Sequence, residues 1–255
     1  MKNDTDDSAI KWWQEARFGL FVHWGIYSAL EGIWEGKEVA GIGEWIQARN
    51  KIPLSVYREY AKELTLSRFD AEEWVSLAKD AGMGYIVLTA KHHDGFAMYD
   101  TDFGEYSIVQ SGPSHRDPAQ ELAQAARKNG LKMCFYYSHA LDWEDPDGKG
   151  NDWDYDSGQK NFEKYFEGKC KHQVRELLTR YGDVGLLWFD IGSVSLQQGA
   201  ELKNMIKEIQ PGCLINGRIC ADRTLADYGS LGDNQVPAGK LKGNWETPVT
   251  LNDTW

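Results

Sequence analysis

The most prominent candidate for chemistry in this sequence is a carboxylate that follows a short apolar run, Leu187-Trp188-Phe189-Asp190. Because side chains alternate along a strand, Trp188 and Asp190 should point to one side and Phe189 to the other. A carboxylate beside so apolar a run is costly to bury unless it is paired or functional. Two interpretations stay open: Asp190 is a catalytic group at the end of a strand, or it caps a helix or turn near Gly192.

Three further acids lie among aromatic or turn residues and could supply a second carboxyl group, namely Glu44, Asp233 and Glu246. Hydrolysis of a glycosidic bond uses two carboxyl groups, one as nucleophile or base and the other as acid. A serine triad is not supported, because Ser193 does not lie in a Gly-x-Ser-x-Gly turn. The sequence therefore favours carboxylate chemistry.

Two adjacent histidines, His92 and His93, form another candidate cluster. Neighbouring residues of a strand face opposite sides, so both could ligate one metal ion only if the chain bends there. The His-Glu-x-x-His spacing of zinc hydrolases is missing. We therefore predict no metal and no cofactor, with one histidine contacting a sugar hydroxyl and the other structural. Metal-dependent hydrolysis at this pair stays as an alternative.

Short apolar runs alternate with longer amphipathic segments, which is typical of an α/β fold with parallel strands. The expected strands are 18–23, 85–90, 131–138, 185–190 and 213–216, and the expected helices are 53–64, 71–81, 119–129, 159–181 and 196–209. No glycine-rich nucleotide turn follows the first strand. Ionisable or aromatic residues stand instead at the ends of successive strands, where barrel enzymes hold their active sites. We predict a (β/α)8-type barrel.

Composition and charge exclude several classes of partner. The 255 residues are 42% hydrophobic and 26% charged, as in an ordinary globular protein. The net charge is −11 without any run of Lys or Arg, which argues against nucleic acid. No apolar run approaches the ~20 residues needed to cross a membrane. Residues 1–7 are polar and acidic, with no secretory signal behind them, which predicts a cytoplasmic protein unless a leader has been removed.

Several longer motifs occur in one order along the chain and carry a family resemblance. They are RFGLFVHWG (17–25), EWI (44–46), TAKHHDGF (89–96), FYYS (135–138), WFD (188–190) and WET (245–247). These motifs resemble those of the retaining α-L-fucosidases of glycoside hydrolase family 29. The stretches SLGDN (230–234) and LNDTW (251–255) look closest to the α-1,6-fucosidases of lactobacilli.

The resemblance implies a retaining exo-α-L-fucosidase that releases L-fucose from fucosylated glycans through a covalent fucosyl-enzyme. Asp190 would be the nucleophile, and Glu246 the acid/base with Asp233 as the alternative. The residues that would hold the fucose hydroxyls are His23, Glu44, Trp45, His92, His93, Tyr137 and Arg218. Trp188 and Trp255 would form an apolar wall against the sugar.

One departure from the family affects the expected fold. Family barrels continue beyond the motif that ends in Trp255, so residues 1–255 are expected to form a single catalytic barrel domain without its last strands and helices. About six strands are counted if 245–251 is included. An open barrel exposes strand edges, which predicts a homo-oligomer. A fucose-binding protein without efficient turnover is the alternative function.

Overall fold

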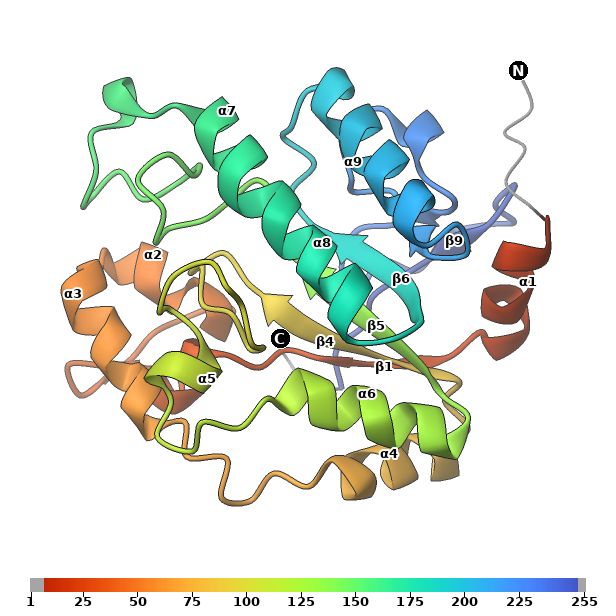
Figure 1. The fold of residues 1–255 in the computed structure, drawn as a ribbon, viewed down its shortest axis with the longest axis horizontal. Coiled ribbons are helices and arrows are strands. Elements are labelled where there is room, and N and C mark those ends of the chain that lie inside the picture. The colour runs from red at the N-terminus through yellow and green to blue at the C-terminus, as the bar shows by residue number, and fades with distance from the viewer. Residues whose placement is uncertain (1–6, 252–255) are drawn as a thin grey trace.

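The computed structural model describes residues 7–251, and a five-stranded parallel sheet lies at its centre (Figure 1). The strands follow the order β1 (Gly19–Val22), β4 (Tyr85–Lys91), β5 (Lys132–Tyr137), β6 (Val184–Phe189) and β7 (Leu214–Ile215). All five strands predicted from the apolar runs are therefore present, and their order in the sheet is their order along the chain. Two small sheets flank them, one pairing β2 (Ile33–Trp34) with β3 (Lys37–Glu38) and the other pairing β8 (Gly229–Ser230) with β9 (Trp245–Glu246).

Several helices begin and end at the capping residues expected from local chemistry. The Asp70 carboxylate accepts hydrogen bonds from the backbone amides of Glu72 and Glu73 at the start of α4. Asp117 caps α6 in the same way, and Gly130 ends that helix in the left-handed conformation. The α-helices are α1 (Asp7–Ala16), α2 (Ile46–Asn50), α3 (Leu54–Tyr57), α4 (Ala71–Asp80), α5 (Ile108–Ser111), α6 (Pro118–Asn129), α7 (Phe162–Tyr165), α8 (Lys171–Arg180) and α9 (Leu196–Ile209).

Two predicted helices are divided into shorter pieces. The helix expected over 53–64 is α3 followed by the 3₁₀ helix η3 (Arg58–Glu63). The long helix expected over 159–181 starts at α7, passes through the π-helical segment η5 (Phe166–Cys170) and continues as α8. Gly168 lies inside that π segment. Glycine in the middle of a helix is destabilising compared with alanine. A π-helical turn is an interruption of the regular α-helical hydrogen bonds within a longer helix. The remaining 3₁₀ helices are η1 (Ile26–Leu30), η2 (Gly43–Trp45), η4 (Ser157–Gln159) and η6 (Arg223–Leu225).

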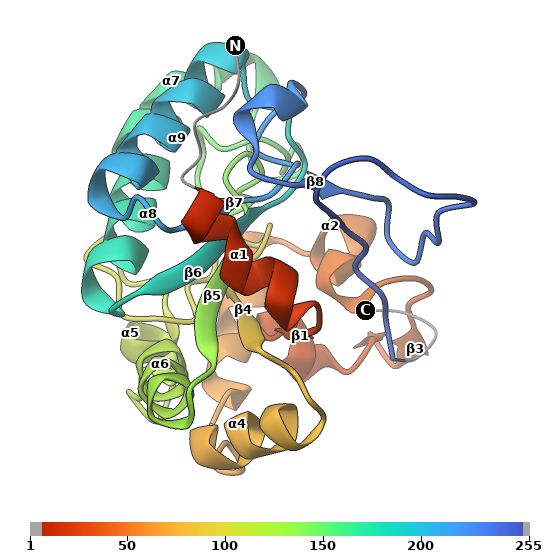
Figure 2. The same cartoon turned by 90° about the vertical axis from the view of Figure 1, so that its right-hand side faces the viewer.

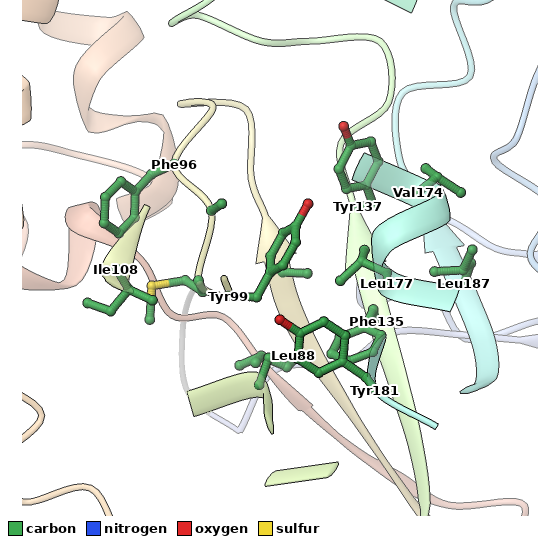
Figure 3. Packing of buried hydrophobic residues seen from close by; sticks show 14 of the residues in the cluster. Leu88, Phe96, Tyr99, Ile108, Phe135, Tyr137, Val174, Leu177, Tyr181 and Leu187 are labelled. Carbon is green, nitrogen blue, oxygen red and sulfur yellow. The ribbon is translucent and has the colours of Figure 1, made fainter. Parts of the chain in front are cut away.

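The two faces of the central sheet pack against different elements (Figure 2). Helices α4, α6, α8 and α9 cover one face, where Phe135, Leu187 and Phe189 are fully buried in the larger core. Figure 3 shows side chains of that core, with Leu177 of α8 beside Leu187 of β6. The opposite face carries a smaller cluster that includes Tyr136 and Trp188, together with Trp13 of α1.

The described residues contain an open sheet, and the closed eight-stranded barrel stays a prediction. Within residues 7–251, β1 is hydrogen-bonded only to β4 and forms one edge of the central sheet. A cavity of about 330 Å³ separates β1 from residues 247–251. The strand expected over 245–251 is limited to β9, which pairs with β8 instead of the central sheet. Pro248 has no amide hydrogen for a ladder there.

No helix within residues 7–251 is both long enough and apolar enough to cross a membrane.

Candidate active site

The carboxyl ends of the central strands meet at a small cavity of about 250 Å³. Its walls come from strand ends and from the loops that follow them, as expected for a parallel α/β sheet. The lining residues are Phe21, His23, Ile42, Glu44, Trp45, His92, His93, Tyr136, Trp188, Asp190, Ile191, Arg218 and Asp233. Nine of the eleven predicted binding or catalytic residues that lie in the described range thus share one cavity.

Asp190 follows β6 directly and is held by donors on both carboxylate oxygens. Its Oδ1 accepts hydrogen bonds from Arg218 Nη1 and from the Ile191 backbone amide, each at 2.9 Å. Its Oδ2 accepts one from the Tyr136 hydroxyl at 3.1 Å. Burial raises the pKa of Asp190, but the facing His93 and the donors on Oδ1 outweigh it and hold this pKa below its ordinary value. The carboxylate is therefore ionised and fixed in position.

The backbone immediately after Asp190 is strained. Ile191 has a φ of +48°, in the left-handed region that a β-branched side chain rarely adopts. Such residues cost of order 1–3 kcal/mol and persist where the surrounding structure demands them. Here the turn aims the Ile191 amide at Asp190 Oδ1. The contacts do not support the interpretation of Asp190 as a helix cap, because its carboxylate lines the cavity and accepts hydrogen bonds from the Arg218 and Tyr136 side chains.

Arg218 connects two carboxylates of the cavity. Its Nη1 contacts Asp190, and its Nη2 contacts Asp233 Oδ1 at 2.5 Å and the Leu231 carbonyl at 3.1 Å. The guanidinium carbon also lies 4.7 Å from the centre of the Trp188 ring. One guanidinium thus holds Asp190 and Asp233 at its two ends, which keeps the two carboxyl groups a short distance apart.

A second polar group consists of His23, Glu44 and His92. One ligand atom from each lies within 4.8 Å of the other two, which is close enough to share a metal ion or a hydroxyl group. Burial raises the pKa of Glu44 to about 6 and lowers that of His23 to about 4. The His92 ring stacks on the Tyr136 ring at 5.0 Å and 3°. Neutral imidazoles beside a carboxyl group provide both acceptors and donors for sugar hydroxyls.

Both adjacent histidines reach the cavity, although strict strand alternation would separate them. Strand β4 ends at Lys91, and its register with β5 shifts between Thr89 and Lys91. The chain has therefore left the strand when it reaches His92 and His93, whose ring centres lie 4.2 Å apart. The Trp45 ring packs edge-on against His93 at 5.1 Å. Both histidines therefore line the cavity, whereas strand alternation alone assigns one of them a purely structural place.

The prediction that Tyr137 lines the sugar pocket is also wrong. The Tyr137 hydroxyl donates to Gln173 Oε1 at 2.9 Å, and its ring lies under Lys91 Nζ at 4.5 Å. Figure 3 shows this side chain among the helix-facing core residues, next to Val174. Its neighbour Tyr136 faces the cavity instead, because adjacent residues of a strand point to opposite sides. The register could have shown this, since Tyr136 pairs with Trp188 across β5 and β6.

Glu246 contacts the site through Trp188. Its Oε1 accepts hydrogen bonds from Trp188 Nε1 at 2.6 Å and from Ser230 Oγ at 2.7 Å. Burial raises the pKa of Glu246 to about 7. Glu246 lines the neighbouring cavity beside β1 and does not line the cavity of Asp190, whereas Trp188 borders both. The last predicted site residue, Trp255, lies outside the described residues.

A small pocket in which a carboxylate stands among neutral imidazoles, indole rings and an arginine-linked second carboxyl is the kind of site that glycoside hydrolases use. Comparison of the whole sequence identifies the family, because the family model described as Alpha-L-fucosidase matches residues 1–255. The chain belongs to the alpha-L-fucosidase family.

Individual relatives agree with this family. Tissue alpha-L-fucosidase of Rattus norvegicus is 32% identical over 192 residues, which are 71% of this chain and 39% of that protein. The chain thus spans about two fifths of the length of this relative. The alpha-L-fucosidase of Vibrio sp. strain EJY3 has a TM-score of 0.94 and 37% identity over 98% of this chain and 46% of its own. AlfC of Lactobacillus casei, in complex with alpha-L-fucose product, has a TM-score of 0.90 and 40% identity, and the match covers 98% of this chain and 81% of AlfC.

Proposed function

We propose that this chain carries the active site of a retaining exo-α-L-fucosidase that releases L-fucose from fucosylated glycans or glycosides. The observation that carries the proposal is the Asp190 carboxylate, ionised at the end of β6 and joined to Asp233 through Arg218. Retaining glycosidases need two carboxyl groups about 5 Å apart. Attachment to the two ends of one guanidinium supports a separation of that order.

In the first step of this reaction, an oxygen of Asp190 attacks the anomeric carbon as the bond from that carbon to the leaving oxygen breaks. The acid/base carboxyl gives its proton to the leaving oxygen, and a covalent fucosyl-enzyme remains. In the second step, the acid/base residue, now a carboxylate, takes a proton from water. The water oxygen attacks the anomeric carbon, and the bond from that carbon to Asp190 breaks. Tyr136 and Arg218 hold the carboxylate in position for both steps.

The geometry favours Asp233 over Glu246 as acid/base. Asp233 lines the cavity of Asp190, and its side chain is 44% exposed, which leaves room for the leaving group. Glu246 is behind the Trp188 indole and accepts two hydrogen bonds there. We therefore rank Asp233 first, reversing the order that the sequence motifs suggested, and assign Glu246 to holding Trp188.

Substrates with different leaving groups test this ranking. An activated aryl fucoside needs little protonation, so loss of the acid should harm it far less than it harms a fucosyl disaccharide. Asp233→Ala should show that unequal loss, and Glu246→Ala should lower both rates by a similar factor. The opposite pattern would return the acid/base role to Glu246.

Hydrolysis of 4-nitrophenyl α-L-fucoside tests the function itself. Release of nitrophenol supports the enzyme, whereas binding of fucose without release supports the alternative of a fucose-binding protein. For the linkage, another structure of AlfC is in complex with Fuca(1,6)GlcNAc. That similarity supports an α-1,6 preference, which a panel of glycans with different fucose linkages would measure. The homo-oligomer and the cytoplasmic location stay predictions from the sequence.

A further inference from the structure

The hydroxyl group of Ser138 determines which nitrogen of His93 carries the hydrogen. Ser138 follows β5, is fully buried and makes two short contacts. Its Oγ lies 2.7 Å from the Leu141 carbonyl oxygen and 2.7 Å from His93 Nδ1. A carbonyl oxygen only accepts, so the single hydroxyl hydrogen of Ser138 is donated to Leu141. The remaining contact then requires that His93 Nδ1 donates its hydrogen to Ser138.

The other ring nitrogen of His93 is left with a lone pair. Burial lowers the pKa of His93 to about 4, so the ring is neutral near pH 7 and carries one hydrogen, on Nδ1. His93 Nε2 has no hydrogen-bond partner among the described residues. It lies 3.6 Å from Asp190 Oδ2, which is also an acceptor. Two acceptors facing each other in a buried cavity need a donor between them.

We propose that Ser138 is a positioning residue that keeps His93 in the Nδ1–H form, so that Nε2 accepts a hydrogen bond from the sugar hydroxyl next to the anomeric carbon. The inference rests on the proposed function, because attack by Asp190 brings the anomeric carbon against this carboxylate. The hydroxyl on the adjacent carbon is then the closest sugar donor to Asp190 Oδ2 and His93 Nε2. Hydrogen bonds to that hydroxyl strengthen in the transition state of glycosidases.

His93 Nε2 and Asp190 Oδ2 therefore favour a sugar that carries a hydroxyl group on the carbon next to the anomeric carbon, carbon 2. A substrate without that hydroxyl leaves Nε2 and Oδ2 facing each other without a hydrogen between them. Removing the Ser138 hydroxyl frees His93 Nδ1 from its acceptor. The ring can then carry its hydrogen on Nε2, where it points at Asp190 and no longer accepts from the sugar. Both changes act on the same hydrogen bond, so their effects should not add.

The tautomer is measured first, on the protein without substrate. Two-bond ¹H–¹⁵N correlation spectra of the imidazole rings distinguish the two forms, and His93→Gln identifies the His93 signals. We expect a protonated Nδ1 and an unprotonated Nε2 in the wild type, and a gain of the Nε2–H form in Ser138→Ala. A wild-type spectrum with hydrogen on Nε2 would overturn the proposal. This reading needs no activity, so it stands apart from any failure of the fucosidase assignment.

Kinetics then test the consequence with 4-nitrophenyl α-L-fucoside and its 2-deoxy analogue. Ser138→Ala should lower kcat/KM about tenfold or more for the fucoside, the effect of one lost hydrogen bond. For the 2-deoxy analogue the same variant should change kcat/KM by less than about threefold. An equal loss on both substrates would show a merely structural role. Ser107→Ala is the matched control, since it removes a buried hydroxyl that caps α5 and should reduce activity on neither substrate.

Discussion

The hydroxyl group of Tyr136 donates a hydrogen bond to Asp190 Oδ2 at 3.1 Å, across neighbouring strands of the central sheet. On the other oxygen, Arg218 and the Ile191 amide are the donors. The carboxylate thus keeps its charge in a buried place because Tyr136, Arg218 and the Ile191 amide donate hydrogen bonds to its two oxygens and Arg218 adds a positive charge.

This contact predicts opposite behaviour for two adjacent tyrosines. Tyr136→Phe removes a hydrogen bond to an ionised group and should lower kcat/KM for an aryl fucoside ~10–100-fold. Tyr137→Phe is its matched control, because it removes a hydroxyl that bonds Gln173 on the helix side. It should reduce stability with little change in kcat/KM. Equal losses of activity in both variants would contradict the assignment of Tyr136 to the cavity.

Burial raises the pKa of Glu246 from 4.5 to about 7, which makes the stability of the folded protein depend on pH. The folded protein binds this proton more tightly than the unfolded chain does. The stabilisation is therefore complete below pH 4.5 and is lost as the pH rises to about 7. Glu246→Gln, which stays neutral, lacks this loss. Urea unfolding measures the free energy of unfolding of Glu246→Gln and of the wild type at each pH. The difference, variant minus wild type, should increase by more than about 1 kcal/mol from pH 4.5 to pH 7.5. Parallel pH curves would show that Glu246 is not held protonated by burial.

The strained turn after Asp190 predicts a stabilising substitution. Asparagine adopts the left-handed conformation more readily than a β-branched residue, so Ile191→Asn should raise the free energy of unfolding by about 1 kcal/mol. Ile191 is among the more exposed large hydrophobic residues, with 40% of its surface exposed, which limits the burial that the substitution loses. Ile191→Val keeps the branched side chain and should give no such gain. Urea unfolding of the two variants measures the difference, and destabilisation by asparagine would refute the strain at this residue.

The close group of His23, Glu44 and His92 makes metal removal informative. We expect these side chains to contact sugar hydroxyls, so dialysis against excess EDTA should leave the rate of fucoside hydrolysis unchanged. A loss of activity that added Zn²⁺ restores would assign a metal to this group and revive the alternative of metal-dependent hydrolysis.

Strand alternation accounts for how much of the site was predictable. The apolar runs indicated the five strands, and a period of two correctly placed Trp188 toward the cavity and Phe189 in the helix-facing core. Position at a strand end, however, does not say which of two adjacent residues faces the site, and Tyr136 lines the cavity where the motif indicated Tyr137. Only the register with β6 decides between them.

Residues on loops were harder to place. His93 reaches the cavity because the chain leaves β4 after Lys91, and Lys91 is fixed by a buried ion pair with Asp142 at 2.6 Å, far along the chain. The ranking of Asp233 and Glu246 likewise depends on which side of the Trp188 indole each acid occupies. Such long-range placement has no local pattern in the sequence.

The stereochemistry of azide rescue tests the central assignment most directly. Asp190→Gly removes the proposed nucleophile and leaves space beside the anomeric carbon, so turnover of 4-nitrophenyl α-L-fucoside should fall by orders of magnitude. Azide should restore part of the rate by attacking from the vacated side, giving the β-fucosyl azide with one inversion. As the matched control, Asp233→Gly keeps the covalent route, so its azide product should be the α-anomer. A variant at Asp190 that keeps more than about a tenth of wild-type kcat, or that forms the α-azide, would contradict the role of Asp190 as nucleophile.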